Sequence, residues 1–162
     1  MISLNSFQIS KNWWNQFPYS LRLLTKIRFY AAFGAGGVIY LTSLIFYNIG
    51  LSETDLGLGF AISAIIGTLT RFFTGNYLNK TRKIKIPLIA SSIISITASL
   101  LLIFSRDTFF YIIGQSFVGA AAGIYWPAAE FGVPYFCHPI ETRKAYSLVR
   151  SSEALGIFLG VF

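Results

Sequence analysis

The chain has 162 residues, of which 54% are hydrophobic and 17% aromatic, whereas only 12% are charged. Soluble domains average roughly 45–50% apolar and about 25% charged residues, so this composition excludes an ordinary water-soluble domain, a disordered segment, a collagenous fibre and a disulfide scaffold. Thirteen Lys and Arg against six Asp and Glu give a net charge of +7, and because most basic residues lie between apolar blocks, the expected partner is the headgroup surface of a lipid bilayer and not nucleic acid.

Residues 1–27 predict a cytoplasmic segment that lies at the membrane interface. Trp13 and Trp14 precede the stretch 21–24, and this mixture of aromatic, apolar and basic side chains suits the headgroup region. The basic region is long and no small-residue cleavage site follows the apolar run, so we do not expect a cleavable signal peptide. A flexible tail with incidental aromatic residues is the alternative interpretation.

Residues 28–162 predict an all-α membrane protein, a multi-pass bundle of transmembrane helices. About 20 apolar residues cross a hydrocarbon core of roughly 30 Å. The second span reaches this length only by passing Arg71, which we expect to snorkel to the headgroups. The last apolar segment ends without a polar flank, which predicts a truncation within the fifth span. The approximate spans are 29–51, 56–78, 86–105, 108–134 and, incomplete, 146–162.

The distribution of Lys and Arg predicts the orientation, because cytoplasmic connections retain these residues. The side opposite to the N-terminus carries only Arg106. We therefore expect a cytoplasmic N-terminus and an integral protein of the plasma (inner) membrane. The basic residues on the predicted cytoplasmic side are Lys11, Arg22, Lys26, Arg28, Lys80, Arg82, Lys83, Lys85, Arg143 and Lys144.

Motifs of enzymes are missing from the sequence. It contains no HExxH, GxSxG, GxxxxGK[ST] or CxxC pattern, and its only histidine and cysteine are His138 and Cys137. A single cysteine cannot form an intramolecular disulfide. We therefore expect no enzyme, no metal and no cofactor.

Small residues predict where helices approach each other closely. Lipid offers little hydrophobic drive between helices, so small-xxx-small spacings mark tight contacts. Gly119 and Gly123 have this spacing in the fourth span, and Gly156 and Gly160 have it in the fifth. Pro127 lacks a backbone donor, so we expect a kink in the fourth span there.

Polar residues within the spans are costly against lipid and are therefore candidates for function. Gln115 and Glu130 share a helix face with Gly119, Ala122 and Trp126, and this face should point into the bundle or into a water-filled cavity. An interhelical hydrogen bond for Gln115 and a position at the cytoplasmic interface for Glu130 are the alternatives. Arg150 and Glu153 can pair on one helix face, either as a structural ion pair or as part of a substrate site.

Three stretches together resemble a known family. The connection 75–83 is similar to a G-x-x-x-D-[RK]-x-G-[RK] loop, with matches at Gly75, Lys80 and Lys83, Asn79 at the acidic position and Arg82 at the second glycine position. Residues 115–123 are similar to an R-x-x-x-G pattern with Gln115 in place of arginine. The third stretch is similar to the connection between a fourth and a fifth span, at residues 126–130 and 139–145, followed by a fifth-span glycine motif at residues 156–160. In order, spacing and sidedness these stretches resemble the N-terminal half of the major facilitator superfamily of transporters.

The resemblance implies secondary active transport of a small solute by alternating access, carried out by a longer transporter. Such proteins are built from three-helix repeats, four per twelve spans, and the first span (33–40) is similar to the fourth (117–125). The missing C-terminal half would lie in the same chain or in a second subunit. The resemblance further implies a cytoplasmic gate region at Asn79, Lys80, Arg82 and Lys83. It also implies a solute cavity, whose expected wall residues are Tyr40, Asn48, Gln115, Tyr125 and Trp126.

A protein of another class remains the alternative. A small five-span membrane scaffold could use its GxxxG faces to recruit partner helices and would need no substrate. A membrane enzyme is disfavoured because no catalytic constellation is present. The sequence does not identify the solute, the direction of transport or a coupling ion.

Overall fold

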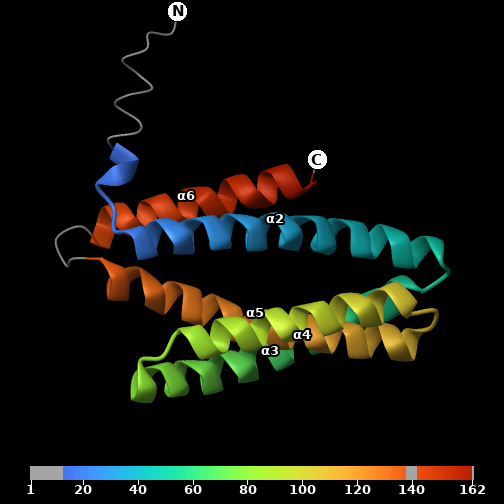
Figure 1. Cartoon of the computed structure of the whole chain (residues 1–162). Helices are drawn as coiled ribbons and strands as arrows, with labels where there is room; N and C mark the ends of the chain where they lie inside the picture. The colour runs from blue at the N-terminus through green and yellow to red at the C-terminus, as the bar shows by residue number, and fades with distance from the viewer. Residues whose placement is uncertain (1–12, 138–141, 162) are drawn as a thin grey trace, which may run out of the picture. The chain divides into compact units, whose positions relative to one another are not determined.

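The computed structural model describes residues 13–137 and 142–161, with the side chains of Ile39 and Tyr40 left out. Within these residues the chain is helical and contains no strand. A short helical turn at residues 13–15 precedes the long helices. These are α2 (Tyr19–Asn48), α3 (Glu53–Thr81), α4 (Lys85–Phe104), α5 (Thr108–Phe136) and α6 (Thr142–Val161) (Figure 1).

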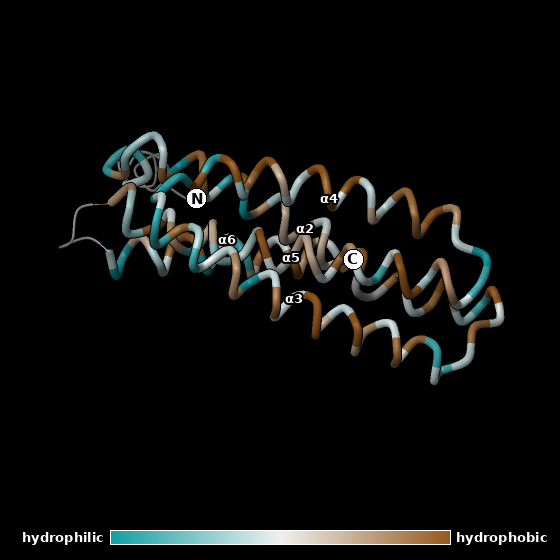
Figure 2. The backbone as a smooth tube through the Cα atoms, turned by 90° about the horizontal axis from the view of Figure 1, so that it is seen from below, coloured by the Kyte–Doolittle hydropathy of each residue, from teal (hydrophilic) through white to brown (hydrophobic). Residues whose placement is uncertain are grey.

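Four of these helices, α2 to α5, are long and apolar enough to cross a membrane. Their hydrophilic residues gather near the connections, as the teal segments in Figure 2 show. Large apolar side chains such as Phe72, Ile96 and Phe104 are exposed along them, which suits helices whose outer faces meet lipid. The prediction of a helical membrane protein is confirmed at this level. Helix α6 (Thr142–Val161) is not among these four helices, so the fifth span stays a prediction.

The helices extend beyond the apolar stretches that predicted them. First, α2 begins at Tyr19, directly after Pro18, where the fixed φ of proline suits the start of a helix. Ser52 then caps α3: its hydroxyl accepts from the Asp55 N–H at 3.1 Å, and Asp55 accepts from the Ser52 N–H at 3.2 Å. Finally, α5 continues as one helix through Pro127, so this proline does not end the helix; a bend there stays a prediction.

Contacts divide the chain into two compact units, which are described separately. Unit 1 comprises residues 1–38 and 132–162 and contains most of α2 together with α6. Unit 2 comprises residues 39–131 and contains α3, α4, the end of α2 and most of α5. The sequence-based segments 1–27 and 28–162 stay predictions, and α2 runs across their boundary as one continuous helix.

A small apolar core lies in unit 2 where the α2–α3 and α4–α5 connections meet. It consists of Phe46, Leu51, Leu56 and Tyr111. The Tyr111 hydroxyl donates to the Leu56 carbonyl at 3.3 Å, and the rings of Phe46 and Tyr111 lie 4.7 Å apart. A Cβ at Gly59 would meet the Tyr111 ring, so glycine leaves the room that this buried aromatic ring occupies.

In unit 2, α3 and α5 cross closely through small residues. A Cβ at Gly119 would meet the Ser63 backbone, and a Cβ at Gly123 would meet the Gly67 backbone and the Thr70 hydroxyl. The contacts advance along both helices together, so α3 and α5 run parallel. The expected packing role of Gly119 and Gly123 therefore has a named partner helix.

In unit 1, α2 and α6 cross in the same way and lie side by side in Figure 1. A Cβ at Gly156 would lie 2.5 Å from the Phe29 carbonyl oxygen, and one at Gly36 would lie 2.7 Å from the Ile157 carbonyl oxygen. A Cβ at Gly160 would meet the Phe33 carbonyl. These helices also run parallel, since the contacts advance together along both.

Filling the α3–α5 crossing should destabilise the protein. We expect Gly123→Leu to lower the free energy of unfolding by at least about 1–3 kcal/mol, the cost of overpacking, because the added side chain meets Gly67 and Thr70. Thermal unfolding in detergent, followed by fluorescence, measures this.

The matched control is Gly57→Leu, because a Cβ at Gly57 on α3 meets open space. This variant should unfold at or above the wild-type temperature, since leucine has a helix propensity that exceeds that of glycine by up to about 1 kcal/mol. Equal destabilisation by both substitutions would contradict the crossing.

Candidate functional site

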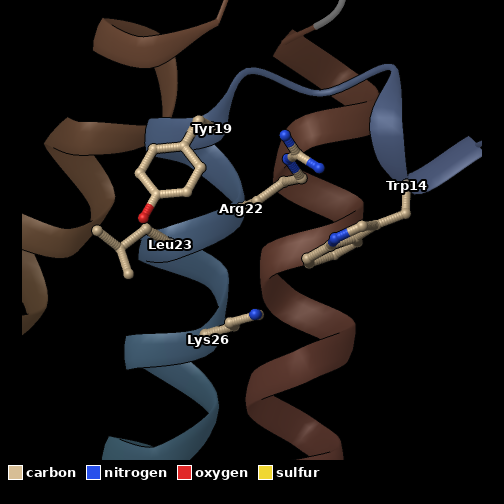
Figure 3. A pocket seen from close by; sticks show the side chains of 5 residues that line it. All are labelled: Trp14, Tyr19, Arg22, Leu23 and Lys26. Atoms are coloured by element: carbon tan, nitrogen blue, oxygen red, sulfur yellow. The ribbon is translucent and has the colours of Figure 1, made fainter.

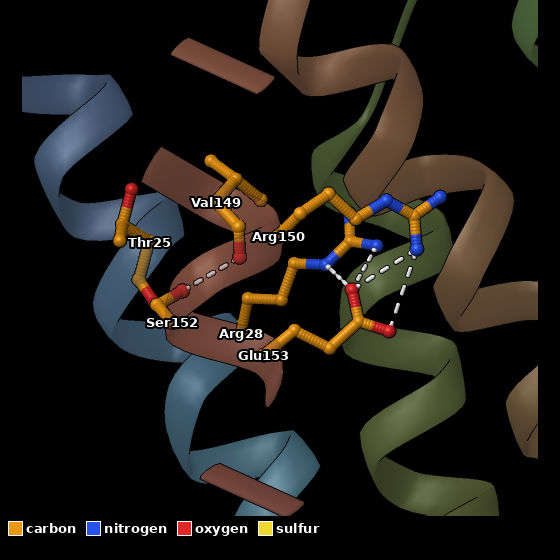
Figure 4. Close-up of polar contacts among 6 residues, drawn as sticks. All are labelled: Thr25, Arg28, Val149, Arg150, Ser152 and Glu153. Atoms are coloured by element: carbon orange, nitrogen blue, oxygen red, sulfur yellow. Dashed lines mark hydrogen bonds and ion pairs between the residues drawn. The ribbon is translucent and has the colours of Figure 1, made fainter. Parts of the chain in front are cut away.

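The strongest candidate site is a buried charge cluster in unit 1, formed by Arg28 on α2 with Glu153 and Arg150 on α6. Arg28 has only 1% of its side chain exposed. Its Nε and Nη2 donate to Glu153 Oε2 at 3.1 and 2.8 Å (Figure 4). One carboxylate oxygen thus accepts two N–H groups of a guanidinium that is closed off from solvent.

Arg150 adds a second cation to the same carboxylate. Its Nη1 donates to Glu153 Oε2 at 3.1 Å, and the Arg150 side chain is 55% exposed whereas that of Glu153 is 16% exposed. The pairing of Arg150 with Glu153, expected from their spacing, is confirmed. Glu153 thus accepts hydrogen bonds from a buried and from an exposed arginine.

The backbone contact between α2 and α6 explains how these side chains meet. Gly156 lies against Phe29, one residue after Arg28, so α6 approaches α2 within one turn of the cluster. Ser152 supports the same approach: its hydroxyl contacts the Thr25 carbonyl at 3.4 Å and the Val149 carbonyl at 2.8 Å (Figure 4). Val149 is fully buried beside them.

Arg28 was missed as a site residue by sequence reasoning, which counted it only as a basic flank. Its partner lies 125 residues further along the chain, beyond the reach of any helix-spacing rule. A usable signal existed: Arg28 directly precedes a long apolar run, where an unpaired guanidinium is costly.

The cluster can act electrostatically. A charged pair at the end of a membrane-crossing helix is costly to bury unless it is well hydrogen-bonded, and such groups mark functional positions more often than structural ones. Because Glu153 is hydrogen-bonded to both Arg28 and Arg150, it can stay bonded to one arginine while its bond to the other breaks.

The residues expected to line a solute cavity belong to unit 2. Gln115 is 2% exposed and its side chain is hydrogen-bonded to Tyr111. Trp126 lies eleven residues further along α5, about 16 Å along the helix axis, and its ring packs against that of Tyr125 at 5.0 Å. Asn48 is the exposed last residue of α2. The Tyr40 side chain lies outside the described residues.

The predicted stripe on α5 faces inward. Gln115 and Gly119 are buried, and Ala122, Trp126 and Glu130 are half-buried. Arg71, in contrast, is exposed on α3, as expected for a side chain that reaches toward headgroups. The cavity role of Gln115, Tyr125 and Trp126 stays a prediction.

The loop motif lies where α3 ends. Gly75 is half-buried in α3, and Asn79 and Lys80 are exposed in its last turns. Arg82 follows the helix with φ 54° and ψ 18°, the left-handed conformation, and its N–H donates to the Leu78 carbonyl at 2.8 Å. Lys83 donates its backbone N–H to the Thr81 hydroxyl at 3.3 Å. Arg82 therefore adopts a conformation that glycine tolerates best.

The chain matches no protein-family model, no curated protein and no solved structure. Within residues 13–137 and 142–161, no group of three His, Cys, Asp or Glu residues is placed to hold a metal ion.

Removing the carboxylate should weaken the burial of Arg28. We expect Glu153→Gln to lower the free energy of unfolding by about 3 kcal/mol, because the buried guanidinium loses the negative charge that accepts two of its N–H groups. Arg150→Gln should cost no more than about 1 kcal/mol, since its side chain is mostly exposed. Thermal unfolding in detergent compares the two variants.

A double variant separates charge from packing. In Arg28→Met/Glu153→Leu both charges are gone, so the protein should regain most of the stability lost in Glu153→Gln. A double variant as unstable as the single one would contradict the pairing as the cause.

Proposed function

We propose that the chain is the N-terminal portion of a secondary transporter that moves a small solute across a membrane by alternating access. The observation that carries the proposal is the pattern of the two close helix crossings. In both, parallel helices meet at small residues: α2 with α6 at Gly156 and Gly160, and α3 with α5 at Gly119 and Gly123.

These two crossings correspond under a three-helix repeat. If the fourth helix repeats the first and the fifth repeats the second, then the pair α2–α6 is equivalent to the pair α5–α3. Inverted repeats place equivalent helices in opposite directions across the membrane. Because both helices of a pair are reversed together, a parallel pair in one repeat arrangement corresponds to a parallel pair in the other. The likeness between residues 33–40 and 117–125 in α2 and α5 agrees with this correspondence.

The backbone at Arg82 supports the family resemblance. The G-x-x-x-D-[RK]-x-G-[RK] loop has glycine at this position, and here the residue has a positive φ of 54°. A left-handed residue after a helix is most often glycine. The geometry that the motif requires is therefore kept, although the glycine is not.

The charge cluster suits a protein whose helices rearrange. Alternating access rocks one bundle against another, which requires contacts that open and re-form. Glu153 is held by a buried and by an exposed arginine, and this arrangement offers the carboxylate a second partner when one contact is strained.

The scaffold alternative receives no comparable support. It needs GxxxG faces that are open to partner helices, but Gly119 and Gly123 are covered by α3, and Gly156 and Gly160 are covered by α2. Both GxxxG motifs therefore form helix–helix contacts within the chain.

Arg82 provides a test of the loop motif. Arg82→Gly should raise the free energy of unfolding by about 1 kcal/mol, because glycine adopts the left-handed conformation without the steric cost that other residues carry. Arg82→Val should lower it by a similar amount or more. Thermal unfolding measures both, and a destabilising Arg82→Gly would contradict the proposed role of this position.

Transport itself is tested with the full reading frame that contains this chain, reconstituted in liposomes. A panel of amino acids, sugars, nucleosides and organic ions is screened for compounds that raise the unfolding temperature, and uptake of each radiolabelled hit is then measured. We expect at least one solute to accumulate above protein-free vesicles. A folded, monodisperse protein that accumulates none of the panel would count against the proposal.

Gln115 is the residue to vary in that assay. Gln115→Leu should reduce uptake by tenfold or more while expression and insertion stay intact, because a buried amide is lost from the inward face of α5. Thr97→Leu is the control, since Thr97 is exposed on α4 and its hydroxyl bonds only within its own helix, to Ile93. Unchanged uptake in Gln115→Leu would remove Gln115 from the solute path.

A further inference from the structure

A groove runs along α2 and α6 in unit 1, beside the charge cluster. Its volume is about 420 Å³, and a neighbouring pocket of about 240 Å³ shares Trp14 and Lys26 with it. The groove is lined by Trp14, Thr25, Lys26, Phe29, Tyr30, Leu148, Ser151, Ser152 and Leu155. The pocket adds Tyr19, Arg22 and Leu23 (Figure 3).

The charge of this surface has one sign. Arg22 and Lys26 are its charged lining residues, and no acidic residue lines either hollow. Glu153 bonds to Arg28 and Arg150, so the nearest carboxylate of α6 is already engaged. Figure 3 shows Arg22 and Lys26 extending from α2 toward the side on which Trp14 lies.

The guanidinium of Arg22 has an N–H donor that lacks an acceptor among the described residues. Its Nη1 donates to the Asn15 side chain at 2.7 Å, and its Nε is buried without a hydrogen-bond partner among the described residues. A buried donor without an acceptor costs about 1–3 kcal/mol, so an anionic oxygen brought against this side chain would be favoured.

The groove changes from cationic to apolar along α2. Arg22 lies near the start of the helix, Lys26 one turn later, and Phe29 and Tyr30 one turn after that. Leu148 and Leu155 of α6 line the same groove. Trp14 lies at the cationic end, as expected of an aromatic residue at headgroup level. This order matches a molecule with an anionic head and an apolar tail.

We propose that the groove is a binding site for one anionic phospholipid. Arg22 and Lys26 hold the phosphate, with Trp14 against the headgroup, and an acyl chain lies along Phe29, Leu148 and Leu155. A lipid is the occupant that fits because α2 is long and apolar enough to span a membrane, and basic pockets between such helices recruit anionic headgroups. The site does not depend on the proposed transport activity.

Trp14 makes the site measurable. The chain has three tryptophans, so Trp13→Phe/Trp126→Phe leaves Trp14 as the reporter. This variant is reconstituted in phosphatidylcholine nanodiscs that contain either brominated phosphatidylglycerol or brominated phosphatidylcholine. We expect brominated phosphatidylglycerol to quench Trp14 fluorescence at a lower lipid fraction, and equal quenching by the two lipids would overturn the proposal.

Charge variants test which residues select the lipid. In the same background, Arg22→Gln/Lys26→Gln should weaken the preference for phosphatidylglycerol by roughly 25- to 30-fold, since each basic residue near the surface contributes about a factor of five. Lys80→Gln/Lys83→Gln removes the same charge from the exposed end of α3 and its connection and should leave the preference unchanged. A similar loss in both variants would mean general charge attraction and would overturn the site.

Two further arms complete the test. Arg22→Lys/Lys26→Arg keeps the charge and should keep the preference, which separates loss of binding from loss of folding. Millimolar glycerol 3-phosphate should not displace the lipid, because it lacks the acyl chain. Its displacement of brominated phosphatidylglycerol would overturn the assignment of the groove to a lipid.

Discussion

Close approach of helix backbones at glycine is the contact on which the described structure depends. Surrounding hydrocarbon is as apolar as the side chains of a span, so helices in lipid gain little by burying apolar surface against one another. Association of helices in lipid therefore depends on dense packing and on polar contacts. Both close crossings obey this rule, since a single Cβ at Gly119 or Gly156 would meet the backbone of the neighbouring helix. Each crossing then determines which polar side chains can meet.

The charge cluster is a consequence of that approach. Arg28 and Glu153 are brought within hydrogen-bond distance, 2.8 Å between Nη2 and Oε2, because α6 lies directly against α2 at Gly156. Near the start of α2, Arg22 and Lys26 line a pocket that has no acidic lining residue. Unit 1 thus carries both a buried arginine paired with a glutamate and a pocket whose charged lining residues are basic.

Composition and charge spacing predicted the helices well because hydropathy alone decides which segments enter a bilayer. The packing roles of Gly119, Gly123, Gly156 and Gly160 were also readable, since GxxxG spacing reports directly on backbone approach. The partner helices could not be predicted, because GxxxG spacing is compatible with any neighbouring helix. Arg28 shows the same limit, as its contact with Glu153 joins residues that no local pattern connects. Helix starts such as Tyr19 lay outside the apolar stretches because a helix can continue through polar residues such as Arg22 and Lys26.

The separation of Arg28 from Glu153 has a consequence for biosynthesis. The helix with Arg28 is synthesised 125 residues before its counter-charge, which at 5–20 residues per second is a delay of roughly 6–25 s. The ion pair between Arg28 and Glu153 can therefore form only after α6 has been synthesised.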